Sequence, residues 1–281
     1  MQLLLPVDPR LESEYSLRAR HPERSDIYER QARSSAELRA RTPGLRTLQY
    51  AKPQECVLDF LPARATASLP APVFVFIHGG YWRALERGIF TFLAQPWIDA
   101  GVHAAFVGYG LAPALRVQGI ASQVQLAMNY LRAHREQLGI DTRRMLVAGH
   151  SAGAHLGACA LDSNDGWHAH AYLGVSGIYD LEPLRHTSVN ADIQLDAAEA
   201  RHISPRWQPA RRPTHHLLVA GGAETQGFRD QTLEFTGYLK EQGSHAEAMI
   251  VPGCTHFDIL DALADPATPL FQATHALLHP H

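Results

Sequence analysis

The sequence predicts an α/β fold, a doubly wound and mostly parallel sheet with helices on both faces. Short apolar runs rich in β-branched and aromatic residues recur along the chain, and such runs are typical of strands buried on both faces of a parallel sheet. Helix-like stretches lie between these runs, and strands that alternate with helices are joined by right-handed crossovers. Because the alternation continues from about residue 55 to the end, we interpret residues 1–281 as a single domain.

The composition restricts the classes of partner. The 281 residues are 46% hydrophobic, which is enough to bury a sizeable core. A net charge of −3 provides no excess of positive charge for nucleic acid or an anionic membrane surface. No apolar run approaches the ~18 residues that a bilayer-spanning helix needs. We therefore expect a small-molecule substrate, no nucleic acid and no membrane partner, and the sequence leaves a homodimer open.

Residues 1–50 are expected to form an N-terminal helical extension. Tyr15, Leu17 and Leu38 are spaced among polar residues as on helices, and Pro22 interrupts the pattern. The apolar start of the chain is too short for a signal-peptide core and has no basic flank. Three cysteines are a sparse and odd set for a disulfide framework. These features favour a cytoplasmic protein.

The remaining elements follow in chain order. The predicted strands are residues 56–61, 73–77, 102–109, 145–148, 171–176, 217–220 and 248–251. The predicted helices are residues 90–100, 120–138, 152–161 and 228–242. Residues 179–213 are too long for a plain connection, and their prolines and helical stretch favour a cap-like insertion over the mouth of a site. The alternative is a surface excursion that does not contact substrate.

A candidate nucleophile follows the strand at residues 145–148. The segment Gly149-His150-Ser151-Ala152-Gly153 has the Gly-x-Ser-x-Gly pattern, and a predicted helix begins directly after it. A sharp turn from strand to helix exposes the serine hydroxyl, and the flanking glycines avoid collisions with neighbouring backbone. The alternative is that the pattern occurs here by chance. A chance match would not be expected to lie between a predicted strand and a predicted helix. We therefore predict that Ser151 is a nucleophile beside a helix N-terminus.

Two consecutive glycines after the strand at residues 73–77 predict an oxyanion hole. In His78-Gly79-Gly80-Tyr81-Trp82, the N–H groups of Gly79 and Gly80 can point toward one oxygen, together with the N–H of Ala152. An ordinary glycine turn is the alternative. We expect His78 to support this loop rather than to act as a base.

A base and an acid are predicted after the last two strands. His256 follows the strand at residues 248–251 and a Pro-Gly turn. Glu224 is the first carboxylate after the strand at residues 217–220, and Asp230 in the next helix is the alternative acid. A carboxylate orients such a histidine and stabilises its cation. Three later histidines belong to a terminal helix or tail: His275, His279 and His281.

The histidines also raise the question of a metal site. All 17 are scattered, and the pairs His168 with His170 and His215 with His216 have no evident third ligand nearby in the sequence. The chain contains no Cys-x-x-Cys pair and no His-Glu-x-x-His pattern. The sequence therefore predicts neither a metal nor a cofactor.

These segments together resemble the kynurenine formamidase (arylformamidase) group, which lies beside the hormone-sensitive-lipase-like esterases within the α/β hydrolases. The matching segments are residues 78–82, 109–113, 149–153, 222–231 and 255–257, with Glu14-Tyr15 and residues 50–59 near the N-terminus. The resemblance implies a triad of Ser151, Glu224 and His256, with no metal. It also implies oxyanion donors from Gly79, Gly80 and Ala152. The sequence departs from the group's pattern in having Glu224 in place of Asp and Gly110 in place of Arg.

The resemblance further implies hydrolysis through an acyl-enzyme. The expected substrate is a formyl group on an aryl amine, as in N-formylkynurenine of tryptophan catabolism. Tyr81, Trp82 and Phe257 are then expected to form an aromatic wall beside the nucleophile, with core packing as their alternative role. A short-chain carboxylesterase uses the same chemistry and remains an alternative. A non-catalytic binding protein of this fold is a further alternative, although all three triad candidates are present.

Overall fold

The computed structural model describes residues 5–64, 68, 70–163, 165–209 and 215–278. Within these residues, eight strands form one sheet in the order β1-β2-β4-β3-β5-β6-β7-β8. The strands are β1 (Arg46–Gln49), β2 (Val57–Leu61), β3 (Ala71–Ile77), β4 (His103–Val107), β5 (Ile140–His150), β6 (Ala171–Val175), β7 (His215–Gly221) and β8 (Ala246–Val251). The β1–β2 and β2–β4 pairs are antiparallel, and the other pairs are parallel. The predicted doubly wound, mostly parallel sheet is confirmed.

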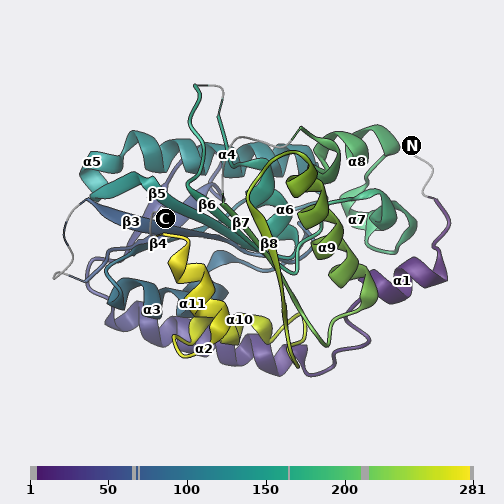
Figure 1. The fold of residues 1–281 in the computed structure, drawn as a ribbon, viewed down its shortest axis with the longest axis horizontal. Helices are drawn as coiled ribbons and strands as arrows, with labels where there is room; N and C mark the ends of the chain where they lie inside the picture. The colour runs from purple at the N-terminus through teal and green to yellow at the C-terminus, as the bar shows by residue number, and fades with distance from the viewer. Residues whose placement is uncertain (1–4, 65–67, 69, 164, 210–214, 279–281) are drawn as a thin grey trace.

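Helices cover both faces of this sheet. The α-helices are α1 (Pro9–Tyr15), α2 (Arg24–Arg41), α3 (Ala94–Asp99), α4 (Val117–Ala133), α5 (Arg135–Leu138), α6 (Ala152–Cys159), α7 (Asn190–Ile193), α8 (Ala197–Ile203), α9 (Gln226–Glu241), α10 (Ile259–Ala264) and α11 (Pro269–Ala276). Short 3-10 helices are η1 (Arg87–Leu93), η2 (Glu182–His186) and η3 (Pro205–Trp207). Figure 1 shows α4 and α6 on one side of the sheet and α2, α3, α10 and α11 on the other.

The continuous apolar runs are explained by burial on both faces. In β3, Val73 and Val75 join the core beneath α4, α6 and α9, whereas Phe74 and Phe76 join the core beneath α3, α10 and α11. The ring of Phe74 stacks on that of Trp97 in α3, with centroids 4.5 Å apart. Since each face of the strand needs apolar side chains, the run shows no alternation.

The structure differs from the expected helical extension at its end. Residues 46–49 form β1, an edge strand that pairs with β2 and is mostly exposed. An exposed edge strand needs no apolar run, so its sequence carried no strand pattern. The predicted single helix over residues 120–138 is also divided into α4 and α5 at His134.

The sheet brings the candidate site residues to one edge. β3, β5, β6, β7 and β8 are parallel neighbours, so their carboxyl ends lie side by side. Ligands of open α/β sheets bind outside these ends. The loops that follow these strands contain the residues predicted for catalysis.

Candidate active site

Ser151 occupies a strained turn between β5 and α6. Its φ of 56° and ψ of −122° are unusual for a residue with a side chain. A Cβ atom on Gly149 would lie 2.2 Å from the carbonyl oxygen of Gly153, and one on Gly153 would lie 2.1 Å from that of Ile77. Both positions therefore require glycine, which is the physical reason for the Gly-x-Ser-x-Gly pattern.

The glycine loop after β3 packs directly against this turn. A Cβ atom on Gly79 would lie 3.1 Å from the Cβ atom of Ser151. Gly80 has a φ of +110°, and a Cβ atom there would lie 2.1 Å from the carbonyl oxygen of Ala84. Ala152 is the first residue of α6, where backbone N–H groups lack acceptors within the helix. The three residues predicted as oxyanion donors thus lie on two segments, the glycine loop and the start of α6, and these segments meet at Ser151.

His78 supports the glycine loop from behind. It is fully buried and stacks on Tyr109, with ring centroids 4.3 Å apart. The Tyr109 hydroxyl donates to the His78 carbonyl oxygen at 2.7 Å. Burial lowers the pKa of His78 to about 4, so the ring is neutral near pH 7. This environment fits the supporting role expected for His78.

His256 and Glu224 are in direct contact. His256 Nδ1 and Glu224 Oε2 are 2.8 Å apart, and both side chains are almost fully buried. A carboxylate accepts, so Nδ1 carries the proton and Nε2 is left free to accept one. The His256 ring also contacts Phe228, with centroids 4.5 Å apart. His150 Nε2 lies 2.8 Å from the His256 carbonyl oxygen and so helps to hold this loop.

The second oxygen of Glu224 is also held. Glu224 Oε1 accepts hydrogen bonds from the Ser176 hydroxyl and the Gly221 backbone N–H, each at 2.6 Å. Asp230, the alternative acid, instead accepts a hydrogen bond from Gln226 on α9. His275 on α11 contacts Trp97, and His279 and His281 lie outside the described residues.

Ser176 is a supporting residue that the sequence analysis missed. It directly follows β6, is fully buried and has a φ of 51°. A lone serine after a strand is common and belongs to no motif, so only its place at the carboxyl edge of the sheet could have indicated a role.

Ser151 and His256 line the same cavity, which has a volume of about 240 Å³. Its remaining walls come mainly from the glycine loop, the N-terminal segment and the insertion, together with the end of β5 and the loop after β8. They comprise Ser16, Leu17, Arg18, Arg24, Tyr28, Gly80, Tyr81, Arg83, Ala84, Leu85, His150, Val189 and Phe257. The N-terminal residues in this list were not predicted to belong to the site, because nothing in their own sequence indicates where the extension packs.

The three predicted aromatic residues occupy two environments. Tyr81 and Phe257 line the cavity. Trp82 is fully buried, does not belong to the cavity lining, and packs edge-on against His155 with ring centroids 5.1 Å apart. Its surroundings are those of the core-packing alternative.

The insertion reaches the cavity through Val189, just before α7. Arg83, which follows the glycine loop, forms an ion pair with Asp192 in α7. Residues 210–213 of the predicted insertion lie outside the described residues. The part that is described contains η2, α7, α8 and η3.

The described residues contain neither a candidate metal site nor a helix that could span a membrane. Within the described part of the chain, no group of three or more His, Cys, Asp and Glu side chains is arranged to hold a metal ion. None of the helices described is both long and apolar enough to cross a bilayer.

Comparison with solved structures defines the class as α/β hydrolases. A Silicibacter sp. protein described as a thioesterase superimposes with a TM-score of 0.85 and 29% identity, over 95% of this chain and 99% of that one. The carboxylesterase EstE1 from a metagenomic library gives a TM-score of 0.74 at 18% identity, over 92% of this chain and 98% of that one, which supports the fold alone. The BD-FAE family profile matches residues 58–181.

Curated relatives narrow the class to a family. Kynurenine formamidase from Salmo salar is 31% identical over 215 residues, which are 71% of this chain and 70% of the relative. Kynurenine formamidase from Drosophila melanogaster is 27% identical over 77% of this chain and 76% of the relative. The chain belongs to the kynurenine formamidase family, and it is a hydrolase.

Proposed function

We propose that this hydrolase is an arylformamidase that cleaves N-formylkynurenine-type formamides through an acyl-enzyme on Ser151. The observation that supports the proposal most is the buried pair of His256 and Glu224, whose histidine lines one small cavity together with Ser151. The relatives named kynurenine formamidase supply the substrate class. A cytoplasmic location remains a prediction from the sequence, which leaves a homodimer open.

In the first half of the reaction, His256 Nε2 takes the proton from the Ser151 hydroxyl as its oxygen attacks the formyl carbon. The oxyanion that forms accepts hydrogen bonds from the N–H groups of Gly79, Gly80 and Ala152. Glu224 stabilises the histidine cation through Nδ1. His256 then protonates the aryl amine as the C–N bond breaks, leaving a formyl ester on Ser151.

In the second half, His256 removes a proton from a water molecule, which attacks the formyl ester. The tetrahedral intermediate collapses, the proton returns to Ser151 and formate leaves. The cavity of about 240 Å³ suits a small acyl group. Tyr81, Phe257 and Tyr28 provide aromatic walls against which an aryl leaving group can pack.

A short-chain carboxylesterase is the second candidate function. Esterase LipC from Mycobacterium tuberculosis is 27% identical over 77% of this chain. The same residues serve both activities, because ester and formamide cleavage pass through the same type of oxyanion.

Rates on N-formylkynurenine and on a short-chain p-nitrophenyl ester distinguish the two functions. We expect a kcat/KM for N-formylkynurenine at least tenfold above that for the ester. Ser151→Ala should remove both activities and leave the circular dichroism spectrum unchanged. A preparation that cleaves the ester and leaves N-formylkynurenine intact would overturn the formamidase assignment.

A further inference from the structure

The charged side chains that line the active-site cavity are all basic. Three arginines line it, namely Arg18, Arg24 and Arg83, and its lining contains no aspartate or glutamate. The whole chain carries a net charge of −3, so this local excess is opposite in sign to that of the molecule. A cleft lined by charges of one sign raises the local concentration of ligands of the other sign.

The three guanidinium groups differ in their partners. Arg83 forms an ion pair with Asp192 of α7, so its charge is balanced. Arg24 Nη1 donates to the carbonyl oxygens of Arg18 and His21, at 2.7 and 3.1 Å, and thereby holds the turn before α2. Arg18 has an exposed side chain, and among the described residues it forms no ion pair or side-chain hydrogen bond.

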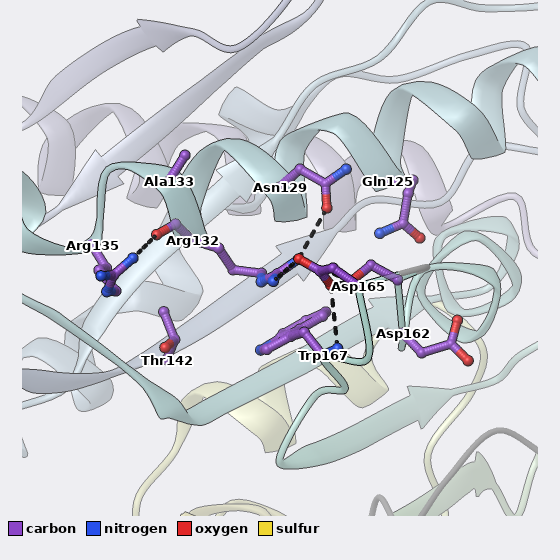
Figure 2. Close-up of a pocket in the computed structure, with 10 residues that line it drawn as sticks. Gln125, Asn129, Arg132, Ala133, Arg135, Thr142, Asp162, Asp165 and Trp167 are labelled. Carbon is purple, nitrogen blue, oxygen red and sulfur yellow. Dashed lines mark hydrogen bonds and ion pairs between the residues drawn. The ribbon is translucent and has the colours of Figure 1, made fainter.

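A second cavity contains an arginine whose charge is balanced by neighbouring side chains. This cavity is lined by residues of α4 and of the loop after α6 (Figure 2). There Arg132 pairs with Asp165 at 2.6 Å and lies over the ring of Trp167, 4.7 Å from its centroid. Within the part of the chain that the structure describes, Arg18 has neither kind of partner, and it belongs to a turn that lines the active-site cavity.

We propose that Arg18 is a specificity-determining residue that binds a carboxylate of the substrate, so that the site selects substrates that carry this carboxylate over matched substrates that lack it. The inference rests on the proposed function and deepens it. The scissile carbonyl lies at Ser151, and the carboxylate lies at the N-terminal wall of the same small cavity. Guanidinium groups bind carboxylates through paired N–H donors, and such charge-assisted hydrogen bonds are among the strongest in proteins.

Two matched substrate pairs test the proposal. The first is N-formylkynurenine and its carboxamide, in which an uncharged group of equal size replaces the carboxylate. The second is an aryl acetate with an ortho propanoate side chain and the carboxamide of that ester. The wild-type enzyme should prefer the carboxylate member of each pair. Arg18→Gln should lower kcat/KM for the carboxylate members by about 10- to 100-fold, mainly through KM, and change the carboxamide members by less than about threefold.

Arg20→Gln is the matched control. It removes the same charge from the same turn, but Arg20 does not line the cavity and donates to Ser13. It should leave all four rates unchanged. Equal losses on both members of a pair in Arg18→Gln, or equal losses in Arg20→Gln, would overturn the proposal. If only the ester pair is hydrolysed and its carboxylate member is preferred, the formamidase assignment fails and the role of Arg18 stands.

Discussion

At the scale of single residues, the length of Glu224 is accommodated by its surroundings. Three donors hold its two carboxylate oxygens: His256 Nδ1, the Ser176 hydroxyl and the Gly221 N–H. A glutamate has one more rotatable bond than an aspartate, and these contacts restrict it. Because these hydrogen bonds hold both carboxylate oxygens in place, Glu224 can orient His256 as the aspartate usual in this family would.

Glu224→Gln should therefore lower kcat by about 10³- to 10⁴-fold with either substrate class, because the uncharged amide no longer stabilises the histidine cation. Asp230→Asn is the control, since Asp230 contacts Gln226 on α9 rather than the histidine. Steady-state kinetics on N-formylkynurenine measures both variants. A large loss in Asp230→Asn with normal Glu224→Gln activity would show that the acid is assigned wrongly.

His155 couples the stability of the fold to pH. Its ring is fully buried with Nε2 at 2.8 Å from the Ile203 carbonyl oxygen, and burial lowers its pKa from 6.5 to about 4. Between these values the unfolded chain binds a proton that the folded protein does not bind. The contribution of His155 to stability is therefore complete above about pH 6.5 and is lost as the pH falls toward about 4.

Removing this group should flatten the pH dependence of folding. In His155→Gln, whose amide can still donate to Ile203, the free energy of unfolding should change less steeply with pH. The slope should fall by at most ~1.4 kcal/mol per pH unit within that window. Urea unfolding at intervals across the window measures the slope. Equal slopes in the two proteins would contradict a neutral buried His155.

At the scale of elements, α1 links the loops that carry the site residues. Glu14 Oε2 accepts a hydrogen bond from the Gly227 N–H at the start of α9, at 2.7 Å. The Thr225 hydroxyl, one residue after Glu224, donates to the Glu14 carbonyl oxygen at 2.8 Å. The Tyr81 hydroxyl donates to the Tyr15 carbonyl oxygen. The N-terminal extension thus connects the acid loop to the glycine loop.

Glu14→Ala should weaken this link. Loss of an anionic acceptor at a helix N-terminus costs ~1 kcal/mol in the free energy of unfolding. Because the acid loop would be held less firmly, we also expect a several-fold lower kcat/KM. Glu14→Gln keeps an oxygen acceptor and should lie between Glu14→Ala and the wild type. Urea unfolding and formamide kinetics measure the series, and a wild-type result for Glu14→Ala in both would contradict the linking role.

The elements also show which features a sequence can predict. The strands buried on both faces, such as β3, were predicted because burial demands continuous apolar residues. The serine turn and the glycine loop were predicted because their close backbone contacts exclude side chains. β1, Ser176 and Arg18 were missed because their roles depend on what lies beside them in space, and their local sequences carry no pattern.

At the scale of the whole molecule, the parallel sheet accounts for the site. The residues proposed for catalysis follow β3, β5, β7 and β8. These strands are distant in sequence, but in the sheet only β6 separates β5 from β7, so their carboxyl ends lie along one edge. Helices pack on both faces of the sheet (Figure 1), so this edge is covered by loops instead. Residues of the N-terminal extension and of the insertion line the cavity at this edge. The architecture therefore brings the residues proposed for catalysis together around Ser151.

Covalent labelling of the native enzyme tests this central claim most directly. A fluorophosphonate reacts with an activated serine, and mass spectrometry of the intact and digested protein counts and locates the adduct. We predict one adduct, on Ser151, in the wild-type protein, and none in folded Ser151→Ala. An unmodified wild-type protein, or an adduct on another residue, would contradict the account.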